Sequence, residues 1–309
     1  MKKIINNLIE YSTQQFHFVF LICMAVFLSI CISINYYFDF EHKVLDTITQ
    51  SWLQVSSYFL FYALAYFPVF IGYCYFFNKQ NLLKNYTFWL SSAVGILTLS
   101  INSSMHFQYW MAKFMVSADL TYWVAKCLRN LFSSLQIFTC LYLFWFFYDR
   151  KKEIFYGFTL KGFHFSPYLI MWFIMLPLIF WASFQPDFLA KYPTYKGSTA
   201  ESFLGMNYLF TLGIYELFYG FDFTFIELLF RGFFVIGIAR IIGPSAVFPM
   251  VSMYCFLHFG KPLGECVSSV FGGYILGVIA LYSRNIFGGV CIHIGVAWTM
   301  ELFAILQKH

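Results

Sequence analysis

The stretch from residue 224 to 240 reads TFIELLFRGFFVIGIAR. It is apolar enough to lie in a lipid bilayer, yet it carries Glu227 and Arg231 four residues apart. A charged side chain at the centre of a membrane helix costs roughly 2.5 to 3.5 kcal/mol even on the lenient insertion scale, so such residues usually face a bundle interior and mark function. The stretch therefore predicts a membrane helix whose two charged groups need partners inside the protein.

The whole chain has the composition of a membrane protein. Of its 309 residues, 61% are hydrophobic, 24% aromatic and 11% charged, which leaves too little polar surface for a soluble protein of this length. Its apolar runs approach the ~20 residues that a helix needs to cross the hydrocarbon core, and they lack the alternation of barrel strands. We expect an all-α, polytopic transmembrane helical bundle of about eight to ten spans. The predicted spans cover residues 17–37, 54–77, 87–102, 131–148, 167–185, 206–240, 245–259, 266–283 and 286–306.

Basic residues recur at every second boundary between the predicted spans. Lys2 and Lys3 precede the first span. Lys79 and Lys84 follow the second, and the run DRKK follows the fourth at residues 149–152. Cytoplasmic loops carry the excess of Lys and Arg in membrane proteins. We therefore expect an integral membrane protein with a cytoplasmic N-terminus.

Residues 206–240 decide the topology of the last spans. If this segment crosses the membrane once, as a long helix that begins outside the bilayer, Arg240 and Arg284 fall on the cytoplasmic side and the C-terminus lies outside. If residues 220–223 break it into two spans, the last three spans reverse and both arginines violate the charge rule. The charge pattern favours a single crossing.

Most of the residues whose side chains could take part in a reaction lie in the C-terminal half of the chain. Residues 1–165 are expected to form N-terminal scaffold helices, with an interfacial segment at 102–130 that is rich in Trp, Met, Lys and Arg. Residues 166–309 are expected to form the functional core. The eight cysteines lack CxxC and CxxH spacing and lie mostly in apolar spans, which indicates packing residues. No basic run with interleaved aromatics points to nucleic acid.

Glu227, Arg231, His258 and His293 are the candidate site residues. On an α-helix, residues four apart share a face, so Arg231 could hold the Glu227 carboxylate ionised and oriented. An ion pair that only locks two helices together explains the same pattern. The two histidines, each in an apolar segment downstream, favour hydrolysis: a carboxylate can take a proton from water, and imidazoles can orient that water or donate to an oxyanion.

The sequence HFGKPLGE, residues 258–265, adds Glu265 to His258. Its proline and two glycines predict a turn at the membrane edge, with Glu265 in the first turn of the next helix. There Glu265 is either a favourable charge near a helix N-terminus or a second carboxylate that reaches back to His258 or Glu227. The other charged residues nearby are expected at the interface, at the rim or in solvent: Glu216, Asp222, Lys261 and Glu301.

Three of these segments carry a resemblance to a known family. IELLFRG (226–232), YCFLH (254–258) and HIGVA (293–297) resemble, in this order, the signature motifs of the CPBP family, the CAAX-protease and bacteriocin-processing intramembrane endopeptidases of the glutamic type. The resemblance covers about residues 165–306 and implies a CPBP-like protease core in the C-terminal half. The segment PDFLAKYPTYK, at 186–196, also resembles the loop that precedes the first motif helix.

The motifs depart from the family pattern at two positions. The family usually has two adjacent glutamates in its first motif, and the first of them is usually given the role of general base. In this chain Ile226 stands at the position of that first glutamate, so the role passes to Glu227 or is lost. The family's third motif usually has an asparagine where Ala297 stands. The chain is similar to a divergent bacterial branch with one glutamate in the first motif and an HxGKPxxE second motif, in which Glu265 would compensate. Together with the charge pattern, this resemblance implies a bacterial inner membrane.

We therefore predict an intramembrane endopeptidase that cleaves a membrane-associated protein or peptide. Glu227 would activate water, Arg231 would fix Glu227, and His258 and His293 would stabilise the oxyanion. No metal or cofactor is expected, although Glu227, His258 and His293 would also suit zinc, with an open fourth position. The alternative is a non-catalytic CPBP-like membrane binding, chaperone or immunity module, for which the substitutions in the first and third motifs argue.

Overall fold

The protein is helical throughout the part of the chain that its computed structural model describes, residues 1–151 and 154–308. No strand occurs in these residues, and Lys152 of the charge pattern lies outside them. In hydrocarbon each unpaired backbone N–H or C=O costs several kcal/mol, and only a helix pairs these groups within one segment. The prediction of an all-α, polytopic helical bundle is confirmed.

Among the described residues, five helices are long and apolar enough to cross a membrane, or six if the bent pair of α4 (Tyr86–Ser103) and α5 (Gln108–Met115) is one span. Nine spans were predicted, and three of them are not among these candidates. α10 (Tyr208–Glu227) has 20 residues but does not pass the joint test of length and composition, and the other two form shorter helices. α7 (Ser166–Ala182) has 17 residues, and α12 (Val247–Phe256) has 10, or about 15 Å against a hydrocarbon core of about 30 Å. The five long helices are α2 (Phe18–Phe38), α3 (Ser51–Phe76), α6 with its extension (Ala118–Asp149), α13 (Leu263–Ser283) and α14 (Phe287–Lys308).

Residues 208–242 form a helical segment without a break at residues 220–223. α10 (Tyr208–Glu227) passes directly into the π-helix η5 (Leu228–Gly237), which leads into α11 (Ile238–Ile242). The continuous helix expected for this segment is therefore present. The side of the membrane on which the C-terminus lies stays a prediction.

The chain divides into two compact units that interleave along the sequence. Residues from both sides of position 165 contribute to each unit, so the compact units do not follow the expected division into a scaffold and a core. The functional meaning of that division stays a prediction. Unit 1 comprises Met1–Ser104, Leu141–Phe163 and Leu228–Gly289, and unit 2 comprises Met105–Cys140, His164–Glu227 and Val290–His309.

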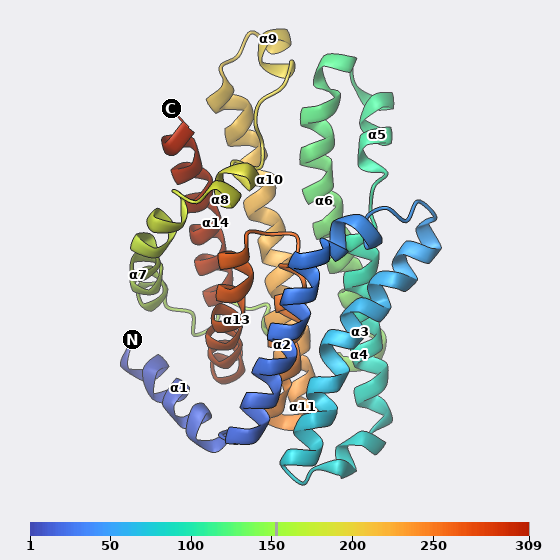
Figure 1. The fold of residues 1–309 in the computed structure, drawn as a ribbon, viewed down its shortest axis with the longest axis vertical. Coiled ribbons are helices and arrows are strands. Elements are labelled where there is room, and N and C mark those ends of the chain that lie inside the picture. The colour runs from blue at the N-terminus through green and yellow to red at the C-terminus, as the bar shows by residue number, and fades with distance from the viewer. Residues whose placement is uncertain (152–153, 309) are drawn as a thin grey trace. The chain divides into compact units, whose positions relative to one another are not determined.

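In unit 1, α12 packs against both α3 and α13. Ser252 of α12 donates a hydrogen bond of 2.7 Å to the carbonyl oxygen of Ala65 in α3. The thiols of Cys255 in α12 and Cys266 in α13 lie 3.8 Å apart, and all eight cysteines are free. α3 and α4 also pack together and lie side by side in Figure 1. The remaining elements of this unit are α1 (Lys2–Gln14), η1 (Glu41–Leu45), η2 (Gln80–Lys84), η3 (Trp145–Asp149), η4 (Phe155–Gly157) and η6 (Gly243–Ala246).

A buried ion pair and two lysines lie at the end of unit 1 where α11 is found. Arg240 pairs with the buried Asp149 at 2.7 Å, and the Tyr156 hydroxyl donates to Asp149 at 2.8 Å. Figure 1 shows the turn between α3 and α4, which contains Lys79 and Lys84, at the same end of the unit as α11. This grouping is what one membrane face requires. That this face is cytoplasmic stays a prediction.

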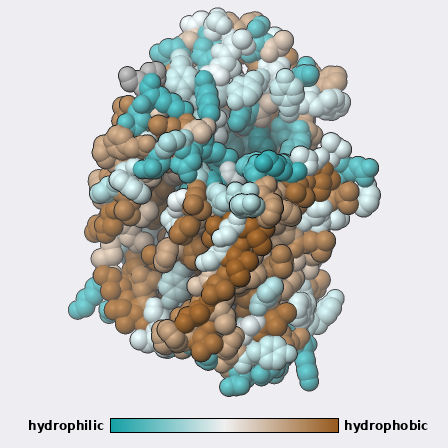
Figure 2. All heavy atoms as spheres, viewed as in Figure 1, coloured by the Kyte–Doolittle hydropathy of each residue, from teal (hydrophilic) through white to brown (hydrophobic). Residues whose placement is uncertain are grey.

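The outer surface of α2 is apolar. Ile22, Val26, Ile30 and Ile34 recur at intervals of four residues, and each is about half exposed. Figure 2 shows hydrophobic side chains along this helix, with hydrophilic ones gathered toward its ends. Water would not favour such a stripe, whereas acyl chains would. The protein is therefore an integral membrane protein.

In unit 2, three tryptophan N–H groups connect the helices. Trp172 of α7 donates to the Thr299 hydroxyl of α14 at 3.1 Å, and Trp298 of α14 donates to the Glu216 carbonyl oxygen of α10 at 3.2 Å. Trp123 of α6 donates to the Thr211 carbonyl oxygen of α10 at 3.0 Å. An indole ring packs with its apolar body while its N–H bonds to an acceptor, so each bond fixes the neighbouring helix at one height. The other elements are α6 (Ala118–Phe144), α8 (Pro186–Lys191) and α9 (Ala200–Leu204).

The predicted interfacial segment, 102–130, contains α5 and the first part of α6, which belongs to a helix long enough to cross a membrane. α5 is a helix of eight residues that exposes Tyr109, Trp110 and Phe114. Aromatic side chains of this kind are enriched at membrane–water interfaces. The interfacial position of the segment stays a prediction.

Two carboxylates hold the loop between α8 and α10. Glu301 of α14 is only 2% exposed, so its expected place at the rim is wrong. It accepts hydrogen bonds from the Thr194 N–H at 2.8 and 3.1 Å and from the Thr194 hydroxyl. The loop preceding the first motif helix is therefore fastened to α14.

Glu201 is the second of these carboxylates. It accepts hydrogen bonds from Tyr195 and Thr211, each at 2.6 Å, and from the Ser198 N–H at 2.8 Å. Burial opposes ionisation of this carboxyl, but these hydrogen bonds outweigh it and lower the pKa of Glu201 to about 2. The ionised form thus ties α9 to the loop and to α10.

Replacement of Glu201 by Gln should destabilise the protein only where the wild-type carboxyl is ionised. A depressed folded-state pKa contributes stability that is complete above the unfolded value near 4.5 and lost as pH falls toward about 2. We expect Glu201→Gln to lower the free energy of unfolding by about 1 to 2 kcal/mol at neutral pH, because the group is partly exposed. The difference should shrink between about pH 4.5 and pH 2 in thermal unfolding of purified protein. The control Glu10→Gln, on the exposed face of α1, should show no such convergence.

Candidate functional site

Glu227 and His293 form a hydrogen-bonded pair in unit 2. Glu227 is the last residue of α10 and is completely buried. Its Oε1 lies 2.9 Å from Nδ1 of His293 in α14, whose side chain is 15% exposed. The ring of Phe223, one turn before Glu227, lies 4.2 Å from the imidazole, centroid to centroid. The predicted acid and one predicted histidine are therefore brought together.

The bond to Glu227 determines which nitrogen of His293 carries a proton. An ionised carboxylate only accepts hydrogen bonds, so Nδ1 must be the donor. In the neutral imidazole Nε2 is then the acceptor, and it can take a proton from a bound molecule. Because Glu227 is buried and His293 is partly exposed, the imidazole is the more accessible member of the pair.

Arg231 lies in the π-helix η5 of unit 1 and is completely buried. Its guanidinium carbon lies 4.3 Å from the centre of the Tyr254 ring in α12, within the range of a cation–π interaction. The expectation that Arg231 fixes Glu227 assumed α-helical spacing between them. The helix changes from α to π after Glu227, but four residues make close to one turn in either helix, so the change of helix type does not test this expectation. The expected role of Arg231 toward Glu227 stays a prediction.

His258 lies two residues beyond the end of α12 and is 9% exposed. Its Nδ1 lies 2.8 Å from the carbonyl oxygen of Tyr254, and the two rings pack edge to face with centroids 4.6 Å apart. A carbonyl oxygen only accepts, so Nδ1 is the donor and Nε2 faces away from this bond. Arg231, Tyr254 and His258 thus form one cluster in unit 1.

α2 supports the turn that carries His258. Asn35 donates to the carbonyl oxygen of Phe259 at 3.0 Å, and the Tyr36 hydroxyl donates to that of Lys261 at 2.7 Å. These two residues were not predicted from the sequence. Their signal was a polar pair near the end of an apolar span, where a buried amide needs partners.

Glu265 pairs with Lys261 across one helical turn. The Lys261 Nζ lies 3.7 Å from Oε1 of Glu265, which stands in the first turn of α13. This arrangement agrees with a favourable charge near a helix N-terminus. A contribution of Glu265 to the chemistry stays a prediction.

Glu216 and Asp222 of α10 are less solvated than expected. Both carboxylate oxygens of Glu216 are buried, with no hydrogen-bond partner among the described residues. Oδ1 of Asp222 accepts a hydrogen bond of 3.1 Å from the Ser134 hydroxyl of α6. Both acids therefore face protein rather than water.

A metal site would need a third ligand near a pair such as Glu227 and His293. Across residues 1–151 and 154–308, no group of three or more His, Cys, Asp or Glu side chains is arranged to hold a metal ion. Glu227 and His293 belong to unit 2 and His258 to unit 1, so the alternative zinc set of these three residues stays a prediction.

Comparison with protein-family models, with curated proteins and with solved structures gave no match for this chain.

Replacement of Tyr36 by Phe should loosen the His258 turn without changing the shape of α2. The variant removes the hydroxyl bonded to the Lys261 carbonyl oxygen, and we expect a loss of about 0.5 to 1.5 kcal/mol of local stability. Faster amide hydrogen exchange at residues 258–262 would report it. Tyr37→Phe, at an adjacent and 83% exposed side chain, is the matched control. Equal exchange in the two variants would contradict the support role.

Proposed function

We propose that the protein is an intramembrane endopeptidase, a hydrolase that cleaves a peptide bond in a membrane-associated or membrane-delivered substrate. The observation that carries this proposal is the 2.9 Å hydrogen bond between Glu227 and His293, two groups held in helices that are otherwise largely apolar. An acid and an imidazole in contact form the standard arrangement for activating a nucleophile in a protein. The motif order supplies the peptidase assignment.

In this proposal the pair works as one general base. His293 Nε2 takes a proton from water while the water oxygen attacks the carbonyl carbon of the scissile bond. Glu227 keeps the imidazole in the required tautomer and stabilises the imidazolium that forms. The proton then passes to the leaving amine. Accessibility favours this division of roles over direct base action by Glu227, because the carboxylate is fully buried.

His258 and Arg231 have supporting roles in the proposal. A protonated His258, held at Nδ1 by the Tyr254 carbonyl, can donate from Nε2 to a developing oxyanion. Arg231 orders Tyr254 through the cation–π contact and so helps to fix the imidazole. Both roles are expectations from the motif resemblance that mutagenesis can separate.

A non-catalytic membrane binding, chaperone or immunity module is the second candidate. It is favoured by Ile226 and Ala297, which stand where the CPBP motifs usually have glutamate and asparagine. Both are buried apolar residues, 8% and 6% exposed. A protein that keeps the helices and loses hydrogen-bonding groups at these positions could retain the fold without the reaction.

Mass-spectrometric comparison of membrane peptide termini would decide between the two candidates. Cells would express wild type, Glu227→Gln, His293→Gln or His258→Ala at matched levels. We expect a peptide terminus present with wild type and reduced by about 10² to 10⁴-fold in the first two variants, because removing a general base costs that much. Asp222→Asn, another acid-to-amide change on α10, is the control and should leave the terminus intact. A terminus unaffected by Glu227→Gln and His293→Gln, or no terminus in a native host, would favour the non-catalytic module.

A further inference from the structure

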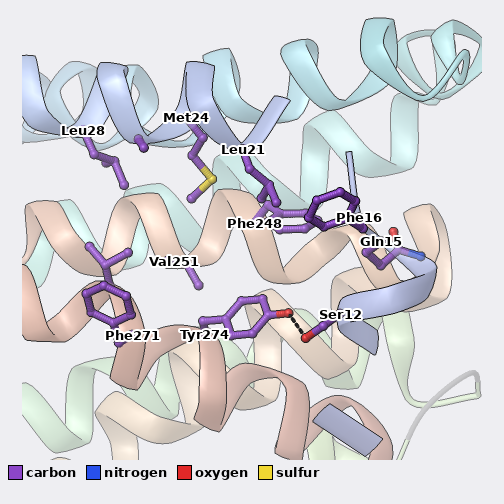
Figure 3. Close-up of a pocket in the computed structure, with 12 residues that line it drawn as sticks. Ser12, Gln15, Phe16, Leu21, Met24, Leu28, Phe248, Val251, Phe271 and Tyr274 are labelled. Carbon is purple, nitrogen blue, oxygen red and sulfur yellow. Dashed lines mark hydrogen bonds between the residues drawn. The ribbon is translucent and has the colours of Figure 1, made fainter. Parts of the chain in front are cut away.

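A hydrophobic groove lies inside unit 1, away from the residues of the proposed reaction. It has a volume of about 360 Å³ and runs between α1 and α2 on one side and α12 and α13 on the other (Figure 3). Its walls include Leu21, Met24 and Leu28 of α2, and Val251 of α12 faces them. A groove of this volume is in the range of small-molecule sites.

The polarity of the groove changes along its length. Ser12, Gln15 and Tyr274 are its polar lining residues, and they gather at one end in Figure 3. Ser12 and Tyr274 hydrogen-bond to each other at 2.9 Å. Each of the two hydroxyls has one proton, and only one of these protons is used in the bond between them. The second proton can be donated to an acceptor on a bound molecule. Beyond this end the lining is aliphatic and aromatic, so the groove suits an amphiphile with one polar end.

The length of the apolar part fits a section of an acyl chain. Leu21 and Leu28 are seven residues apart on α2, which corresponds to about 10 Å along a helix. That is about a third of the hydrocarbon thickness of a bilayer. An apolar groove is a poor site for water, which needs several polar partners, and an empty one loses dispersion contacts on its walls.

The groove is continuous with the surface that faces the lipid. Ile22 and Val26 on α2, and Val267 and Phe271 on α13, flank it and are 43% to 67% exposed. In an integral membrane protein the medium against these side chains is the acyl chains of the bilayer. The molecules that can enter from the side are therefore lipids.

α1 places the polar end of the groove at headgroup level. This helix carries Lys2 and Lys3 at its start and exposes Ile5 and Ile9, four residues apart. Basic and apolar residues on an amphipathic helix are typical of one that lies in the membrane interface. Tyr11 anchors it to unit 1 through a hydrogen bond of 2.9 Å to the Pro244 carbonyl oxygen.

We propose that this groove binds one phospholipid of the surrounding membrane. One acyl chain lies along Leu21, Met24 and Leu28, and an ester or phosphate oxygen accepts a hydrogen bond at the Ser12–Tyr274 end. The site is independent of the proposed hydrolysis, since it uses none of the residues assigned to that reaction.

Photocrosslinking of the full chain in lipid vesicles tests this site. The vesicles contain phosphatidylethanolamine and phosphatidylglycerol, with a trace of phosphatidylglycerol that carries a diazirine in one acyl chain. We expect labelling concentrated on the α2 and α13 peptides that line the groove. Ala25→Trp fills the groove from its exposed side and should reduce this labelling about tenfold. Val26→Trp, on the lipid face beside it, is the matched control and should retain it.

A second variant tests the Ser12–Tyr274 end of the groove. Tyr274→Phe keeps the ring and removes the hydroxyl, and we expect two- to tenfold weaker labelling, roughly the effect of one hydrogen bond. Labelling that follows only the outer residues of α2, or that is equal in Ala25→Trp and Val26→Trp, would overturn the proposal in favour of ordinary lipid contact. Crosslinks between two copies of the chain through α2 would also overturn it, because a second copy would then cover the groove.

Discussion

Every backbone N–H and C=O that lies in hydrocarbon needs a partner within the protein, and the rest of this structure follows from that constraint. It leaves helices as the regular structure among the described residues, including the three-turn α12 and the π-helix η5. Apolar contacts then do little to fix the positions of the helices, because an apolar side chain packs against lipid or against another helix with similar energy. The hydrogen bonds of the few polar side chains fix the helices at particular heights, as the tryptophans of unit 2 do.

Within each unit, several buried ionisable side chains have partners of the same unit. Asp149 meets Arg240, the Arg231 guanidinium lies over Tyr254, and Glu227 meets His293. A buried charge without such a partner is strongly destabilising, so these contacts explain how charged residues persist in apolar surroundings. The same low dielectric strengthens each contact, which makes the sites suitable for chemistry as well as for stability.

The fold class could be predicted from composition because hydrocarbon permits so few structures. The helix limits were harder. Residues 245–259 are apolar, so they were predicted to form a span. In the structure α12 is buried in protein along its whole length. A helix buried in protein and a helix in lipid need the same apolar side chains, so the sequence does not distinguish them. The pairing of Glu227 with His293 was within reach, since both are polar outliers in apolar runs. The contact of Arg231 with Tyr254 was not, because no pattern in the sequence places a residue of η5 against α12. The prediction for Glu301 was wrong for a related reason. Its position near the C-terminus does not indicate that it contacts a loop more than a hundred residues earlier in the chain.

The turn that carries His258 is held by Asn35 and Tyr36, residues more than 220 positions earlier in the chain. During synthesis α2 is made first, so it enters the membrane before its polar partners exist. The amide of Asn35 must then stay near water or accept a temporary partner until α12 and the following turn are made. Completion of the His258 turn is therefore a late step in assembly, and any activity that depends on this histidine arises only after nearly the whole chain has been inserted.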